Sequence, residues 1–272
     1  MITLDELIDK AVTEKGFPRI SSTTLGNYLK VELITLKEIR FHPVARNSPQ
    51  TKKQRCDYCN YFLANSTKNY VFIDEMGVSI GTKRNRSRGL KGKRAIAKSP
   101  LSKAPNISIC MAINKEHGVI RYSMQDHAYD GDSFTKFIKE LIKKCKKLKM
   151  DEVCFILDNC KIHKANNNNI VKLCQKFDIE VKFLPPYSPE LNPIENAFSI
   201  YKSKIKSQLR TKYLKELLST NKAKRGEKTR KRQKILFKAC KEASSVIDSE
   251  LVTRLYSHTV AVFPLVFHNE DL

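Results

Sequence analysis

The sequence predicts an α/β fold in which a mixed sheet is flanked by helices. Short runs of β-branched and aromatic residues alternate with longer segments of helical periodicity. This pattern is typical of strands that form one sheet and helices that pack on its faces. The chain has 272 residues, enough for one α/β domain with smaller appendages. We expect a small helical unit at 1–45, a linker at 46–67 that leads into a short helix, the α/β domain at 68–210 and a basic helical extension at 211–272.

The N-terminal unit should consist of two helices. Thr3 and Glu6 have the spacing of a capping box, the Gly-Phe-Pro segment at 16–18 ends the first helix, and Ser21 or Ser22 caps the second. The pattern fits a helix-turn-helix, whose second helix enters the major groove of DNA, and fits a plain helical hairpin equally well. In the first case, the candidate DNA contacts on the second helix are Thr24, Asn27 and Lys30.

The α/β domain should contain strands separated by helices. The second and third strands form a hairpin around 114–118. The helix after this hairpin begins with Asp132 as its N-cap. In chain order we expect strands at 69–74, 106–113 and 118–124, a helix at 132–148, a strand at 152–157, a helix near 165–177, a strand at 179–184 and a long helix at 196–218.

Three carboxylates occupy positions that suit a metal centre. Asp74 and Asp158 each end an apolar run, so each should emerge at the end of a buried strand, and Glu195 enters a helix. Each acid alone has a simpler reading, as a turn residue or a first-turn helix acid. Together they can hold two Mg²⁺ or Mn²⁺ ions about 3.5–4 Å apart, an arrangement that clamps the attacking and leaving oxygens of a phosphodiester.

A strong excess of positive charge predicts a polyanionic partner. Lys and Arg number 51 and Asp and Glu 28, which gives a formal net charge of +23. Such an excess favours phosphate contacts through counterion release. The sequence has no apolar run of about 18 residues and no basic N-terminus followed by an apolar segment. We therefore expect an intracellular protein that does not bind a membrane.

Two segments concentrate the positive charge. Residues 83–103 contain nine Lys and Arg and no acid, and residues 222–241 contain ten Lys and Arg and one Glu. An isolated charge run is usually a solvated surface, but the first run closely follows Asp74 and includes Gly89 and Gly92, which suit a turn. We interpret it as a loop that grips a nucleic-acid strand. Its candidate contacts are Lys83, Arg84, Arg86, Arg88, Lys91, Lys93 and Arg94.

The eight cysteines do not form a recognisable framework. Cys56 and Cys59 are the one close pair, and a structural zinc site would need two more ligands at regular spacing. His42 could supply one of them. The other cysteines are scattered singly, several within apolar runs where Cys packs as a small hydrophobe. We expect no disulfide framework and no zinc.

Four motifs resemble those of mariner-like DDE transposases, a group that comprises the Tc/mariner superfamily and bacterial insertion-sequence relatives. The most specific is the proline-rich string at 184–195, Leu-Pro-Pro-Tyr-Ser-Pro-Glu-Leu-Asn-Pro-Ile-Glu. The others are Ile-Asp-Glu-Met-Gly at 73–77, Arg-Gly-Leu-Lys-Gly at 88–92 and Leu-Asp-Asn-Cys-Lys-Ile-His at 157–163. The resemblance is strong over 68–210, weak over 20–65 and faint near 235–260.

This resemblance implies a ribonuclease-H-like fold and an enzyme that performs cut-and-paste transposition at terminal inverted repeats. Residue by residue, it makes Asp74, Asp158 and Glu195 the catalytic metal ligands for two Mg²⁺ or Mn²⁺ ions. It implies double-stranded DNA as partner, a homodimer on that DNA, and action in a nucleus or a bacterial nucleoid. The supporting residues would be Glu75, Asn159, His163 and Asn192.

The chain departs from the family pattern in two respects. The family usually carries Trp where Leu90 and Phe198 stand, and the N-terminal region has room for about one helix-turn-helix where two are common. The first departure concerns packing more than chemistry. The second implies a truncated copy or a reduced module for binding transposon ends, and it favours the alternative of a catalytically silent DNA-binding protein derived from a transposase. A further alternative is a ribonuclease-H-like nuclease that does not join strands.

Overall fold

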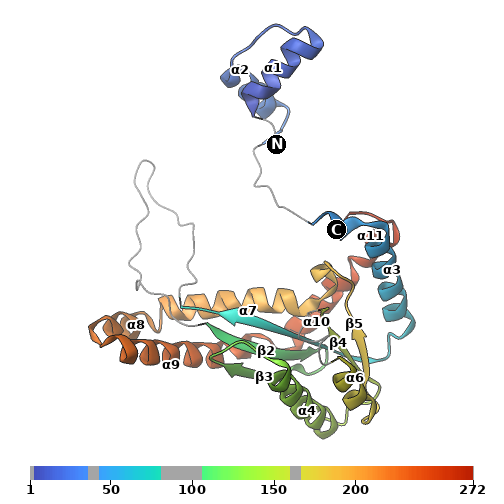
Figure 1. Cartoon of the computed structure of the whole chain (residues 1–272), viewed down its shortest axis with the longest axis vertical. Helices are drawn as coiled ribbons and strands as arrows, with labels where there is room; N and C mark the ends of the chain where they lie inside the picture. The colour runs from blue at the N-terminus through green and yellow to red at the C-terminus, as the bar shows by residue number, and fades with distance from the viewer. Residues whose placement is uncertain (1–2, 36–42, 81–105, 160–166, 272) are drawn as a thin grey trace. The chain divides into compact units, whose positions relative to one another are not determined.

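The computed structural model describes residues 3–35, 43–80, 106–159 and 167–271. The chain divides into two compact units, Met1–Pro43 and Val44–Leu272, which are described separately below (Figure 1). None of the described helices is both long and apolar enough to cross a bilayer.

The first unit contains helices α1 (Leu4–Lys15) and α2 (Ser22–Val31). The capping box forms as expected, because the Glu6 backbone N–H donates to Thr3 Oγ1 over 3.2 Å and the Thr3 N–H donates to Glu6 Oε2 over 2.6 Å. Gly16, with a φ of 67°, ends α1 in the left-handed conformation that glycine adopts without strain. Ser21 is the N-cap of α2.

The second unit is built on a five-stranded mixed sheet in the order β3-β2-β1-β4-β5. Strand β1 is central: it pairs antiparallel with β2 and parallel with β4. This arrangement confirms the predicted mixed sheet, and all five strands lie close to their expected positions. Their bounds are β1 Asn69–Val78, β2 Ile107–Asn114, β3 Gly118–Gln125, β4 Val153–Leu157 and β5 Glu180–Phe183.

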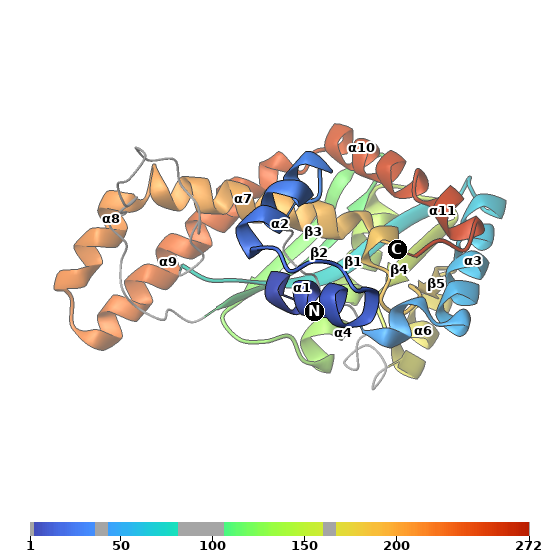
Figure 2. The ribbon, with the colours of Figure 1, turned by 90° about the horizontal axis from the view of Figure 1, so that it is seen from above.

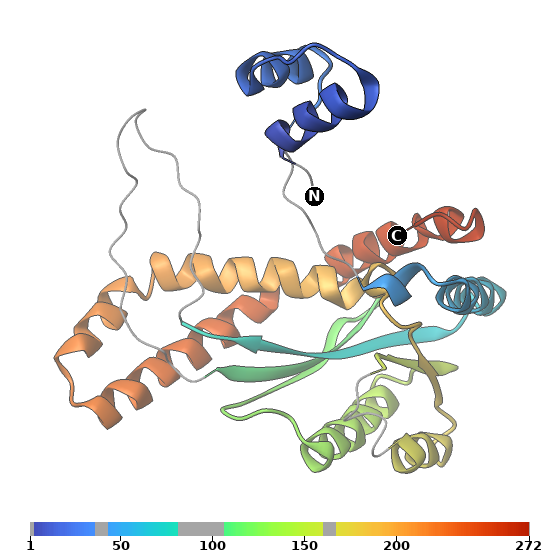
Figure 3. The same cartoon turned by 45° about the horizontal axis from the view of Figure 1, so that its top comes forward.

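Each face of the sheet is covered by its own set of helices (Figure 3). Because side chains alternate along a strand, Phe72 and Met76 of β1 pack on one face while Val71 and Ile73 pack on the other. The first face is covered by α3 (Pro49–Ala64), α7 (Pro193–Arg210), α9 (Arg225–Ala243), α10 (Ser249–Val260) and α11 (Phe263–Phe267). The second face is covered by α4 (Gly131–Lys147) and α6 (Asn167–Gln175).

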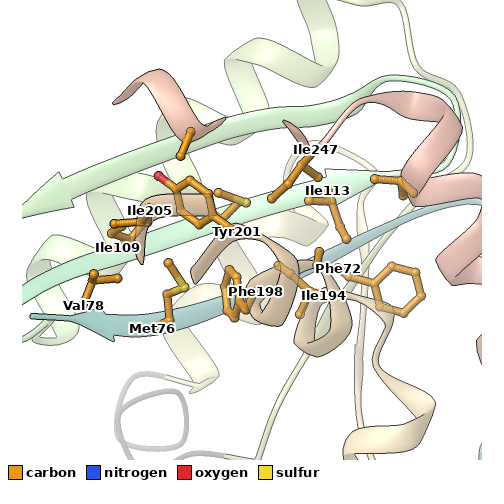
Figure 4. Packing of buried hydrophobic residues seen from close by; sticks show 14 of the residues in the cluster. Phe72, Met76, Val78, Ile109, Ile113, Ile194, Phe198, Tyr201, Ile205 and Ile247 are labelled. Atoms are coloured by element: carbon orange, nitrogen blue, oxygen red, sulfur yellow. The ribbon is translucent and has the colours of Figure 1, made fainter. Parts of the chain in front are cut away.

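The core on the α7 face joins segments that are distant in sequence. Ile194, Phe198, Tyr201 and Ile205 of α7 lie against the strands in Figure 4, and each is at most 3% exposed. Phe198, which replaces the Trp usual in the family, is therefore a packed core residue. Burial of such side chains stabilises the fold by about 1.5–3 kcal/mol each.

Two predicted regions differ in the structure. The short helix expected after the linker is longer than predicted: residues 49–64 form helix α3, which begins with Ser48 as N-cap and Pro49 in its first turn. This helix is part of the core because Phe62 stacks on Tyr70, with ring centroids 4.3 Å apart. The expected C-terminal extension likewise belongs to the same compact unit as the sheet. Its further elements are α8 (Leu214–Ser219) and short 3₁₀ helices at Thr220–Lys222 and Ser244–Val246.

Smaller corrections concern helix boundaries. The N-cap of α4 is Asp130 rather than Asp132, since Asp130 Oδ1 accepts a hydrogen bond of 2.8 Å from the Ser133 N–H. Asp130 directly precedes the helix and Asp132 lies in its first turn, so sequence spacing alone could not separate them. The long helix expected at 196–218 begins earlier, at Pro193, and ends at Arg210 before α8.

One turn requires glycine. Gly118 begins β3 with a φ of 64°, and a Cβ at this position would lie 2.8 Å from the Ser249 backbone nitrogen. The turn between β2 and β3 therefore packs directly against the start of α10. Any larger residue would push the two apart.

Candidate functional site

The strand register brings two of the three candidate acids together. Ile73 of β1 pairs with Leu157 of β4, the last residue of that strand, so the next residues along these parallel strands are Asp74 and Asp158. Neighbouring strands lie about 4.8 Å apart. We expected Asp74 at a strand end, but β1 continues to Val78, and Asp74 lies within the strand. It still reaches the edge of the paired region because β4 ends there.

The third acid comes from the segment that leads into α7. Glu195 lies in the first turn of this helix, after Pro193, and its N–H donates to the Asn192 carbonyl over 3.2 Å. Asp74, Asp158 and Glu195 all line one cleft of about 510 Å³. Its remaining walls are Asn159, Asn192 and the proline-rich loop from Leu184 to Pro189. Three distant segments of the chain thus converge on a single site.

The electrostatics of this cleft favour a bound cation. Asp74 is only 7% exposed, and burial, together with the charges of Asp158 and Glu195, raises its pKa to about 8. Partial desolvation also raises the pKa of Glu195, with Asp158 adding to the effect and Lys202 opposing it. A divalent cation would remove the cost of placing these negative charges together.

The donor set fits Mg²⁺ or Mn²⁺. Both are hard cations that prefer carboxylate and amide oxygens, and the cleft offers three carboxylates. In the described part of the chain, no three His, Cys, Asp or Glu side chains are already arranged around a metal position. Like charges repel one another, so binding would require these carboxylates to rotate towards the ion.

Asn192 supports Asp74 through its side chain. Its Nδ2 donates to Asp74 Oδ2 over 3.2 Å, while the Glu75 backbone N–H donates to Asp74 Oδ1 over 2.7 Å. The Asn192 side chain is 3% exposed, and its Oδ1 has no hydrogen-bond partner among the described residues. A buried amide oxygen without a partner beside a carboxylate is a natural acceptor for a cation or its bound water.

The other predicted supporting residues have different positions. Asn159 lines the cleft, and its Nδ2 donates over 2.5 Å to the Leu184 carbonyl, which ties the end of β4 to the proline-rich loop. Glu75 alternates with Asp74 along β1, so its side chain points to the α4 face, away from the cleft. His163 and the basic loop from Lys83 to Arg94 lie outside the described residues.

Arg55 is a supporting residue that the sequence did not indicate. It is 1% exposed on α3, and its guanidinium donates to Ser188 Oγ over 2.8 Å and to the Tyr187 carbonyl over 3.1 Å. Its neighbour Arg46 pairs with Glu190 in the same loop. These contacts hold the loop that carries Asn192 and Glu195. The sequence does not indicate this role for Arg55, because the residue follows a polar segment that is typical of a linker.

The remaining candidates lie on helices α2 and α3. Thr24, Asn27 and Lys30 are exposed along one side of α2 in the first unit. Cys59 is buried, and burial raises the pKa of its thiol to about 12. That environment suits a small apolar side chain better than a thiolate ligand.

Comparison with known proteins identifies relatives of this architecture. The family described as DDE superfamily endonuclease matches residues 69–218. The Mos1 strand transfer complex is 16% identical with a TM-score of 0.67, and the match covers all of this chain and 74% of that chain. The Mos1 mariner paired end complex with Mn is 16% identical with a TM-score of 0.63, covering 98% of this chain and 78% of that one.

The catalytic domain of the Mos1 mariner transposase is 13% identical, with a TM-score of 0.53 over 85% of this chain and 95% of that chain. These likenesses confirm the predicted ribonuclease-H-like fold, and with the family match they confirm the mariner-like resemblance. Comparison with curated proteins gave no match.

Proposed function

The chain belongs to the DDE superfamily endonucleases, and on that basis we propose that it is a transposase, which cuts DNA strands and joins the freed ends to a target. The observation that supports this most is the convergence of Asp74, Asp158 and Glu195 on one cleft. A protein that only bound DNA would have no need to bury an acid beside two others at a cost in stability.

In this proposal Asp74, Asp158 and Glu195 hold two Mg²⁺ or Mn²⁺ ions. When bound, the ions would activate a water or a 3′-hydroxyl and stabilise the in-line displacement at phosphorus. The Mn in one of the similar Mos1 complexes agrees with this choice. Asn192 orients the Asp74 carboxylate through its hydrogen bond, and Asn159 fixes the loop opposite. Glu75 donates its backbone N–H to the Asp74 carboxylate.

The proposed partner is double-stranded DNA, bound by a homodimer. Residues 1–45 would recognise the inverted repeats through Thr24, Asn27 and Lys30, and the loop from Lys83 to Arg94 would hold phosphates near the cleft. Residues 68–210 would form the catalytic domain. Such an enzyme acts where a cell keeps its DNA, in a nucleus or a nucleoid.

The proposal is tested by Asp158→Asn with Asp151→Asn as a matched control. Both variants remove the same carboxylate charge. Asp151 is a suitable control because it is exposed just before β4, outside the cleft. We expect Asp158→Asn to bind repeat-ended DNA with unchanged affinity and to lose Mg²⁺-dependent cleavage, while the control cleaves normally. Cleavage by Asp158→Asn would overturn the proposed site. Joined products in the wild-type reaction distinguish a transposase from a simple nuclease.

A further inference from the structure

We propose that one face of α7 is a track that holds the backbone of a DNA strand as it leaves the catalytic cleft. The track consists of Lys202, Lys206 and Arg210 and starts about two turns after Glu195 on α7, the helix labelled in Figure 2. This inference rests on the proposed function, because it assumes that the scissile phosphate lies at the three acids.

Helical geometry aligns the track with the active-site acid. Glu195, Ser199, Lys202, Lys206 and Arg210 are separated by three or four residues, so they lie along one side of the helix. A separate side of α7 is packed in the core, through residues that are at most 6% exposed: Ile194, Phe198, Tyr201, Ile205 and Leu209. The basic side chains therefore follow the rim of the core and face outward.

The side chains are placed to meet an anion. Arg210 is exposed and Lys202 and Lys206 are partly exposed, and among the described residues none of the three forms an ion pair with a carboxylate. Lys202 lies about two turns of α7 after Glu195, which lines the cleft, so the track starts close to the cleft. Between Glu195 and Glu216 the chain has no acid at all.

The arm that carries the track is strongly basic. Residues 202–234, which form the end of α7, α8 and most of α9, contain fourteen Lys and Arg and two Glu. In Figures 1 and 2, α7 and α9 run side by side beyond the edge of the sheet and α8 joins them. The Tyr201 hydroxyl donates to the Cys240 carbonyl over 2.7 Å, and buried Arg232 donates to Thr220 Oγ1 over 2.8 Å. A packed arm of this charge suits a polyanion better than a protein partner.

The length of the track gives the position of the contacts on the DNA. A rise of about 1.5 Å per residue places Lys202 about 10 Å and Arg210 about 22 Å along the helix from Glu195. At about 3.4 Å per nucleotide along one strand, these distances span about three to about seven nucleotides from the scissile phosphate, on one side only.

The experiment compares two triple variants that remove the same charge. One is Lys202→Gln, Lys206→Gln, Arg210→Gln. The control is Lys139→Gln, Lys144→Gln, Lys147→Gln on exposed positions of α4, on the opposite face of the sheet. Binding to a fluorescein-labelled duplex of random sequence is measured by anisotropy at a series of salt concentrations, in EDTA.

We expect the slope of log Kd against log salt to fall by about two to three for the α7 variant, because each lost phosphate contact removes about 0.9. The α4 control should keep the wild-type slope. Equal slopes for the two variants would overturn the track. If the triple variant does not fold, Lys206→Gln alone is used, with an expected loss of about one in the slope and an unchanged slope as the contrary result.

The outcome is separable from that of the proposed function. The slope is measured without Mg²⁺, so intact cleavage with an unchanged slope would reject the track and leave the transposase standing. Conversely, if the α7 variant and the α4 control differ in slope but the wild-type protein cuts no DNA in Mg²⁺, the proposed transposase function is rejected and the track stands. In a duplex with a known cut site, phosphates about three to about seven nucleotides from that site can be replaced by neutral methylphosphonates. This replacement should weaken DNA binding by the wild-type protein and leave DNA binding by the α7 variant unchanged.

Discussion

Helices α4 and α7 cover opposite faces of the same sheet, and each begins at a polar residue in extended conformation. The Asp130 side chain stabilises α4 itself, since its carboxylate accepts a hydrogen bond from the Ser133 N–H and caps the helix. Asn192 of α7 makes no such capping bond and instead donates to Asp74. One helix start is used for stability and the other for the site.

The same division runs through the neighbouring residues of β1. Asp74 points into the cleft beneath α7, and Glu75 points to the face that α4 covers. Both are carboxylates, and they point to opposite faces only because successive side chains alternate along a strand. The face of the sheet, rather than the residue type, therefore decides which of the two carboxylates can act in catalysis.

The largest expected effect is the loss of cleavage on one face alone. Asp74→Asn should abolish Mg²⁺-dependent strand cleavage, because the variant loses a charged oxygen ligand in the cleft. Glu75→Gln should cleave at a rate close to that of the wild type, since its backbone N–H remains to bind residue 74. Gel analysis of end-labelled DNA measures both rates. Equal losses in the two variants would contradict the division between the faces.

The next effect concerns stability without metal. Because the pKa of Asp74 is raised from 3.8 to about 8, the folded protein favours the neutral acid. The penalty for its charge is absent below pH 3.8, grows as the pH rises towards about 8 and is constant above it. In EDTA at neutral pH, Asp74→Asn should therefore raise the free energy of unfolding by a few kcal/mol.

Urea unfolding at neutral pH and at the acid end of this interval measures that gain. The advantage of Asp74→Asn should shrink as the pH falls towards 3.8, and saturating Mg²⁺ should reduce it by stabilising the wild type. A gain that did not depend on pH would show that the buried charge is not its source.

Asn192→Ala should have a smaller, functional effect. Removing a supporting hydrogen bond of a metal ligand typically lowers metal affinity by about 10–100-fold, and Asn192 does not cap its helix. Mn²⁺ titration followed by electron paramagnetic resonance should show this loss. The matched control is Asn196→Ala, one turn further along α7, which should keep the wild-type affinity.

The smallest effect belongs to the other helix start. Asp130→Ala removes the cap of α4 and should cost about 1 kcal/mol of unfolding free energy without changing metal affinity. Asp132→Ala, which removes an acid that does not cap, should cost less. If thermal unfolding ranked these two variants in the opposite order, the assignment of the cap to Asp130 would be wrong.

Local pattern predicted much of the fold and the candidate acids. The apolar runs in β1 and β4 are continuous because strands covered on both faces are apolar throughout. The length of helix α3 and its place in the core were not predicted, because its apolar side chains lack a clear helical period and follow a polar segment at 47–53 that is typical of a linker. Arg55 was missed with it, since a single Arg in such a segment looks solvated.

The sequence by itself determined the composition of this protein's chemistry: three acids, a proline-rich approach to Glu195 and a large excess of positive charge. Tertiary structure decided how these parts are used. The pairing of Ile73 with Leu157 set Asp74 beside Asp158, and burial of Arg55 positioned the loop before α7. Strand register and long-range packing depend on contacts between distant segments, 84 residues apart for Ile73 and Leu157 and 133 for Arg55 and Ser188, which no local pattern of residues can specify.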